Sequence, residues 1–221
     1  MVELILSAFA IGVSVASLLV TFKQNKHALK VQLFELRIRR YYLLNALVQA
    51  VSEHKTVFTH MFDAKEALAV NARSQLNLLI NNTVFDPMYK LLEEKGYQDY
   101  EHDVFKLIDN LKQEAASITL VFADNQYSQL AERFVLTYID VVAGLYEHHV
   151  FATKRLSRDN LLGMRTAGIV DEITLVDCKE SLERNSVLPN LQKMLDIFNV
   201  LEKTEVLNQI KNQVNLSNPK S

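Results

Sequence analysis

The chain has 221 residues, about half of them apolar, and a formal net charge of −2. This length provides one ordinary domain with an appendage, and the charge argues against a general nucleic-acid binder, whose domain is normally strongly basic. The single cysteine, Cys178, excludes an internal disulfide and a zinc site built on a cysteine pair. We expect Cys178 to be a small core residue.

Residues that form turns are scarce. The chain contains five glycines and three prolines, where average usage would be about 12% of residues for the two types together. Neither type occurs between Val13 and Asp86. We therefore predict an all-α fold, in which an N-terminal transmembrane helix continues into a cytoplasmic helical bundle.

The first segment, residues 1–22, is predicted to be the transmembrane helix. No charged residue occurs from Leu4 to Phe22, and a helix of that length spans about 28 Å, close to the thickness of a bilayer's hydrocarbon core. Because the basic residues follow the apolar run, the segment does not resemble a cleaved signal peptide. The alternative is a buried core helix.

Basic residues at the end of this segment predict its orientation. Lys23, Lys26 and Lys30 follow the apolar run and are expected to contact lipid head groups, whereas only Glu3 and the terminal amine precede it. The positive-inside rule then places the N-terminus outside and the larger part of the chain in the cytoplasm. A lone reduced cysteine fits that compartment.

Small and hydroxyl-bearing residues recur within the apolar run. One row, at steps of three and four residues, is interpreted as an oligomer seam or pore lining: Ser7, Ala10, Ser14, Ser17 and Thr21. A second row, at steps of four, would allow close helix packing: Ala8, Gly12 and Ala16. The alternative is that a single span tolerates these residues, because Ser and Thr can bond back to their own backbone.

Residues 23–57 are predicted to be a juxtamembrane helical stalk. Apolar residues lie on two of its sides, one carrying Leu29, Leu33, Leu36, Leu43 and Leu47, the other Val31, Phe34, Ile38 and Tyr41. A helix apolar on two sides needs partners on both, which we expect to be its own domain and another subunit. Arg37, Arg39 and Arg40 lie too far from the span for lipid contact, so a solvated or salt-bridged face is expected.

The cytoplasmic bundle is predicted over residues 58–211, followed by a polar tail, 212–221, that frays. Helical periodicity and capping signals favour helices at 64–81, 86–96, 100–122, 125–153, 157–168, 172–182 and 188–210. The segments 100–122 and 125–153 are expected to form an antiparallel hairpin. With the stalk and the 64–81 helix they would make a four-helix-type bundle.

Catalytic motifs are not found. The histidine clusters Glu53-His54-Lys55 and Glu147-His148-His149 lack the Glu-x-x-His spacing of metal sites in bundles, so solvated histidines are expected there. Helical ribonucleases of the HEPN type carry an arginine four to six residues before a histidine, and no arginine here has one. Phosphate-binding and nucleophile-elbow motifs are also missing. We expect no catalytic residue, metal or cofactor.

Two segments carry a resemblance. Residues 33–44, LFELRIRRYYLL, and 152–162, ATKRLSRDNLL, resemble parts of bacterial single-span membrane-anchored helical proteins, which include phage abortive-infection proteins. The resemblance implies a role in antiviral defence at the bacterial inner membrane, as an oligomerising effector or accessory that perturbs or permeabilises it. A CRISPR-associated accessory with a catalytically dead HEPN-like domain fits the same outline, and the other alternative is a passive membrane-tethered interaction module.

The partners expected from this reading are the lipid bilayer, further copies of the chain, and a protein or nucleoprotein on the cytoplasmic side. No direct binding of nucleic acid is predicted, because the net charge is slightly negative.

Overall fold

A computed structural model describes the backbone of residues 2–95, 101–123, 125–161 and 172–216, and the side chains of 12–93, 102–123, 125–156 and 174–216. The described residues form helices and no strand, which confirms the all-α prediction. The helices are α1 (Val2–His60), α2 (Lys65–Val70), α3 (Arg73–Ile80), α4 (Asp86–Lys95), α5 (Glu101–Ala116), α6 (Ile118–Val121), α7 (Gln126–Leu161), α8 (Glu172–Arg184), α9 (Val187–Lys203) and α10 (Val206–Leu216).

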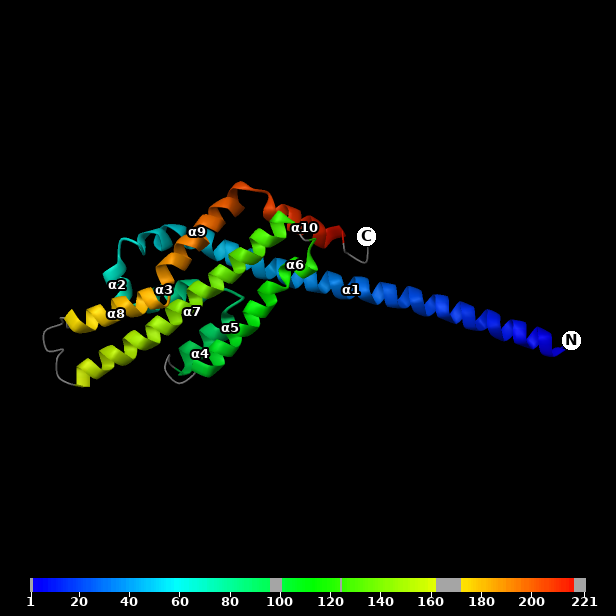
Figure 1. Ribbon diagram of the computed structural model, residues 1–221, viewed down its shortest axis with the longest axis horizontal. Coiled ribbons are helices and arrows are strands. Elements are labelled where there is room, and N and C mark those ends of the chain that lie inside the picture. Colours follow the sequence, from blue (N-terminus) through cyan, green and yellow to red (C-terminus); the bar gives the residue numbers. More distant parts are fainter. Residues whose placement is uncertain (1, 96–100, 124, 162–171, 217–221) are drawn as a thin grey trace.

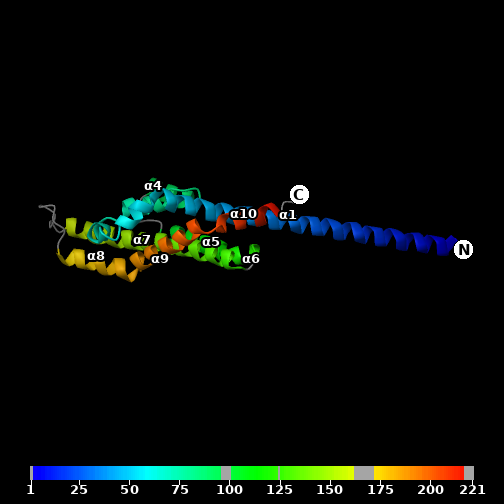
Figure 2. The same cartoon turned by 90° about the horizontal axis from the view of Figure 1, so that it is seen from above.

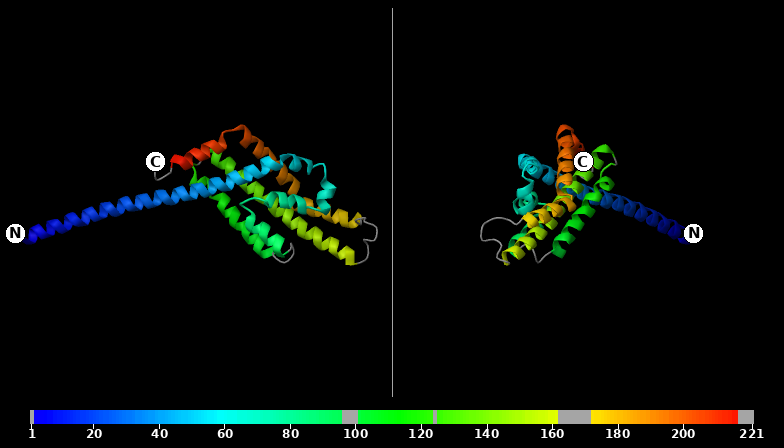
Figure 3. Two further views of the ribbon diagram at one scale, coloured as in Figure 1. Left: turned by 180° about the vertical axis from the view of Figure 1, so that it is seen from behind. Right: turned by 60° about the vertical axis from the view of Figure 1, so that its left-hand side comes forward.

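Helix α1 has two parts with different surroundings. Its N-terminal part projects far from the rest of the molecule, and its C-terminal part lies within the bundle (Figure 1; Figure 3, left). The first residue of α1 in the hydrophobic core is Leu43, and Phe34, Ile38 and Tyr41 pack against that core from its edge. The predicted uninterrupted helix from residue 23 to 52 is confirmed and extends to His60.

Helix α7 is the centre of the bundle. It packs against α9 most extensively and also against α5, α8, α3, α10 and α1, and its inward face is fully buried at Phe134, Tyr138, Val142 and Tyr146. Helices α5 and α7 run antiparallel and in contact, as predicted (Figure 1). The predicted four-helix arrangement omitted α9, which is the largest neighbour of α7; Figure 2 shows α9 between α8 and α10 along the same layer.

Three predicted helices are each divided in two. The 64–81 segment breaks at Asn71, where the backbone is extended (φ −145°, ψ 84°). The 100–122 segment breaks at Ser117, whose hydroxyl donates to the Glu114 carbonyl at 2.7 Å. The 188–210 segment breaks at Thr204 (φ −113°, ψ 155°), whose hydroxyl donates to the Val200 carbonyl at 2.8 Å. In the last two, a local hydroxyl-to-carbonyl bond accompanies the break, a known competitor of helix continuation.

Two boundary predictions are wrong. A new helix was expected to open at Ser157, but α7 continues to Leu161, because the polar run there suits a helix interior as well as a start. The predicted end near Gly168 lies outside the described residues. The tail was expected to fray from residue 212, but α10 extends to Leu216 with Val214 buried. Cys178 is buried and free, as predicted.

Candidate functional site

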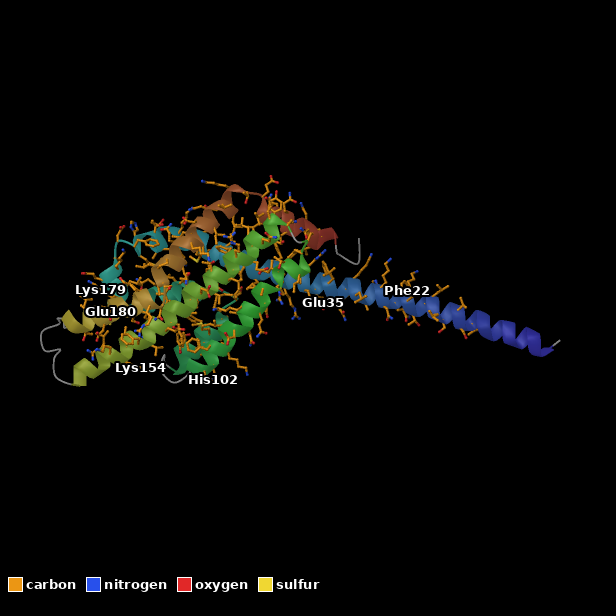
Figure 4. All side chains as sticks on the ribbon, in the orientation of Figure 1. Phe22, Glu35, His102, Lys154, Lys179 and Glu180 are labelled. Atoms are coloured by element: carbon orange, nitrogen blue, oxygen red, sulfur yellow. The ribbon has the colours of Figure 1, made fainter. Side chains whose placement is uncertain are left out.

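The projecting end of α1 is the most unusual surface of the molecule. Every side chain described between Gly12 and Lys30 is exposed, including Leu18 at 71% and Phe22 at 69%. Figure 4 shows Phe22 on the projecting part, and Glu35 nearer the point where the helix meets the bundle. Large apolar side chains on all sides of an isolated helix are typical of a helix that is covered by something outside its own chain.

The hydroxyl-bearing residues of the predicted seam lie along this exposed part. Ser14, Ser17 and Thr21 share one side of the helix with Leu18 and Asn25. The Thr21 hydroxyl donates to the Ser17 carbonyl at 2.9 Å, so it is satisfied within its own helix, as the alternative interpretation required. The side chains of Ser7 and Ala10 lie outside the described residues.

The predicted close-packing row is also open. A Cβ atom added to Gly12 would meet no atom within 4 Å, and Ala16 is exposed. Nothing in the chain itself therefore requires a small residue at either position. The side chain of Ala8 lies outside the described residues.

Lys23, Lys26 and Lys30 are exposed directly after the apolar run. No helix, over the residues that the structure describes, has a stretch both long and apolar enough to cross a membrane. The side chains of residues 1–11, which form the first half of the predicted span, are outside that description.

Two arginines fix α1 where it leaves the bundle. The Arg37 guanidinium donates from Nε to the Val121 carbonyl (2.8 Å) and from Nη1 to the Gln213 carbonyl (3.1 Å). These carbonyls lie in the last turns of α6 and α10, where backbone acceptors lack helical partners and a cation is favourable. Partial burial lowers the pKa of Arg37 from its ordinary value, but a guanidinium remains charged at physiological pH.

Arg40 makes the second anchor. Its Nε donates to the Ser117 hydroxyl (2.7 Å), and its Nη1 pairs with the Glu114 carboxylate (2.6 Å) while only 11% of its side chain is exposed. The predicted salt-bridged face is thus found at Arg40, whereas Arg39 is exposed. No sequence signal identified the acceptors, because they lie between 74 and 176 residues further along the chain.

The prediction of solvated histidines is wrong at Glu147-His148-His149. His148 is fully buried and His149 nearly so, because this turn of the central helix α7 is covered by α2 and α8. The spacing contained a signal: His149 falls four residues after buried Leu145 and three before buried Ala152. At the other cluster, His60 is exposed and lies 3.6 Å from Asp63.

The environment of His148 determines its tautomer. Nε2 lies 3.0 Å from the Ala69 carbonyl and 3.3 Å from the Leu68 carbonyl, so it donates there, and Nδ1 accepts from the Ser181 hydroxyl at 3.2 Å. Burial lowers the pKa of His148. His148 and Ser181 have the residue types of a hydrolytic pair, but both are buried, so a substrate cannot reach them. Their role is to join the end of α2 to α8.

Neither metal chemistry nor a known relative identifies the protein. In the part of the chain that is described, no three His, Cys, Asp or Glu side chains gather as a metal site requires. The chain matches no family model, no curated protein and no solved structure. The projecting end of α1 and its anchor at Arg37 and Arg40 are therefore the features on which a function can be argued.

Proposed function

We propose that the protein is a single-pass membrane-anchored effector of the bacterial inner membrane, which self-associates and perturbs or permeabilises the bilayer. The observation that carries this proposal is the projecting, uncharged end of α1. Its large apolar side chains lie apart from the bundle core, and each such side chain removed from water contributes about 1.5–3 kcal/mol. Lipid tails would cover all sides of the helix at once.

The lysines support the anchoring and its direction. Lys23, Lys26 and Lys30 lie where the apolar run ends, at the depth of lipid head groups. In this arrangement the bundle lies on the cytoplasmic side, where basic residues are enriched next to spans. The clamps at Arg37 and Arg40 then connect the anchor to the bundle, so that a partner engaging the bundle can act on the span.

Self-association is supported by the open surfaces at Gly12 and Ala16, which allow helix backbones to approach closely. The antiviral role rests on the resemblance of residues 33–44 and 152–162. Within the structure, the first of these segments is where α1 enters the bundle and where Arg37 and Arg40 lie.

The test is dye release from vesicles of bacterial lipid reconstituted with the purified full chain. The wild-type protein is expected to release a small dye and the Gly12→Leu variant to release less, because a leucine separates the helices. The control is Leu18→Ile, which keeps the apolar volume. A wild-type protein that inserts but releases no dye would contradict the permeabilising role.

A passive membrane-tethered module is the second candidate, because the bundle has a complete core of its own away from the projecting helix. The two functions differ in what they require of the span. Replacing residues 4–22 by an unrelated span of equal length should preserve the function of a tether and remove that of an effector that assembles through α1.

A further inference from the structure

A second row of residues runs along α1 without interruption from the predicted span into the stalk. At steps of three and four, the span contributes Gly12, Val15, Leu19 and Phe22, and the stalk contributes Leu29, Leu33 and Leu36, with Lys26 between the two groups. We call this row the seam. Its apolar members are all exposed, and its steps are those of a heptad pattern, in which one helix meets another along its whole length.

The seam faces away from the protein's own bundle. Phe34, Ile38 and Tyr41 pack against the core, and at about 100° per residue their mean direction lies about 140° around the helix from that of the stalk leucines. The seam ends where the bundle closes around α1, since the next position, Arg40, is bound to Ser117 and Glu114.

Lipid cannot cover the lower half of the seam. Leu33 and Leu36 lie 11 and 14 residues beyond Phe22, which is about 16 and 21 Å along the helix and past the three lysines at the head groups. A protein surface must therefore cover these leucines. In the upper half, the open side of Gly12 suits the backbone of another span.

We propose that the seam pairs α1 with α1 of a second copy, in parallel and in register, from Gly12 to Leu36. This rests on the proposed membrane anchoring, which gives two copies the same orientation and depth, so that each residue of the seam meets its equivalent. Because a seven-residue repeat drifts about 20° per heptad on a straight helix, the two helices wrap around each other with a left-handed twist.

The flanking charges permit this pairing. In a parallel pair, the residues beside the stalk seam face each other as Asn25 with Lys30 and Gln32 with Arg37. No two like charges meet at these flanks. Lys26 is the one charged residue in the seam itself, and it lies at the head groups, where its amine can extend to water and phosphate.

The pairing assigns different places to the two rows predicted in the span. Ser14, Ser17 and Thr21 lie about 150° around the helix from the span half of the seam. Continued at the same steps, their row passes Glu35 and reaches Ile38, which packs against the protein's own core. The hydroxyl row therefore lies outside the paired interface, and Gly12 lies inside it.

Disulfide trapping in the membrane tests this pairing at adjacent positions. The full chain carries Cys178→Ala, whose folding is checked by its melting curve, together with one of four substitutions: Val15→Cys and Leu29→Cys in the seam, and Ser14→Cys and Ala28→Cys one residue earlier. Bacterial membranes are oxidised with copper phenanthroline, and covalent dimer is measured on a non-reducing gel. A flotation assay on the same samples measures membrane association.

Dimer is expected at Val15→Cys and Leu29→Cys, with only collisional levels at Ser14→Cys and Ala28→Cys. The reverse pattern, or equal trapping at adjacent positions, would overturn the seam. Chains that float with the membrane but give no dimer would refute the pairing and leave the anchoring intact. Dimer at Leu29→Cys in chains that do not float would support the stalk pairing and refute both the anchoring and the pairing within the span.

Discussion

The Nε atom of Arg37 donates a hydrogen bond of 2.8 Å to the carbonyl oxygen of Val121, joining α1 to the end of α6. The same guanidinium reaches the Gln213 carbonyl in α10, at 3.1 Å. One side chain thus ties three helices at the point where α1 leaves the bundle. Because charge-assisted hydrogen bonds of this kind are strong, this contact fixes the direction in which the projecting helix points.

The first prediction concerns this contact. Arg37→Met keeps an apolar stem but removes every donor, so the free energy of unfolding should fall by about 1–3 kcal/mol. The measurement is urea unfolding of the solubilised full chain, followed by circular dichroism. Arg39→Met is the matched control on the exposed side of the same turn and should stay within about 0.5 kcal/mol of the wild type. Equal losses in both variants would argue against the clamp.

The second prediction compares two glycines. A Cβ atom at Gly144 would lie 2.7 Å from the Asn185 carbonyl oxygen and 3.2 Å from a Val187 methyl group. Gly144→Ala should therefore destabilise the bundle by about 1–3 kcal/mol through overpacking, although alanine is the better helix former. Gly12→Ala meets no atom and should leave the melting temperature of the bundle unchanged. A stabilised Gly144→Ala variant would show that α7 and the α8–α9 turn can separate easily.

The third prediction concerns a buried tyrosine. The Tyr138 hydroxyl donates to the Leu79 carbonyl at 2.6 Å, and burial raises the pKa of Tyr138, so the donor stays protonated. Tyr138→Phe should cost about 1 kcal/mol, because the Asn82 amide still donates to the same carbonyl at 2.7 Å. Asn82→Ala should cost more, since the Asn82 side chain also accepts from the Val84 and Phe85 amides. Thermal melts of the two variants give this order or contradict it.

The fourth prediction is a pH dependence. Burial, together with the charge of Arg73 and with His148, lowers the pKa of His149 from 6.5 to about 4. Between these values the unfolded chain binds a proton at His149 that the folded chain does not. The free energy of unfolding should therefore fall as the pH falls from 6.5 towards 4, by up to about 1.4 kcal/mol per pH unit.

The pH dependence is checked by melts at half-unit steps of pH. His149→Gln should make the decline shallower, measured against its own value at pH 7.5, whereas His102→Gln, an exposed histidine on α5, should leave the profile unchanged. If the decline is the same with and without the His149 imidazole, other groups must cause it.

The sequence predicts the helices well where their ends carry local signals. Asp86-Pro87 marks the start of α4, and the lack of glycine and proline after Val13 predicts the long continuous α1. The break at Ser117 was not predicted, because the same hydroxyl that bonds to Glu114 also accepts from Arg40 in a distant helix. Long-range contacts of this kind leave no trace in a local pattern.

The candidate site shows the same division. The exposure of an uncharged helix and the lysines that follow it agree with what periodicity and charge predict. Which side of α1 its own bundle covers was not predictable, because that depends on Phe34, Ile38 and Tyr41 packing against helices far along the chain. His148 and His149 were misjudged for a related reason: their polarity suggested a solvated face, whereas their spacing placed them on the buried side of α7.

The most direct test of the account is alkaline carbonate extraction of bacterial membranes that contain the full chain. The wild-type protein is predicted to remain in the membrane pellet. A Val15→Arg, Leu18→Arg variant should move to the supernatant, because each arginine in the middle of a span costs about 2.5–3.5 kcal/mol on insertion. Release of the wild-type chain by carbonate, or retention of both chains alike, would contradict anchoring through the projecting end of α1.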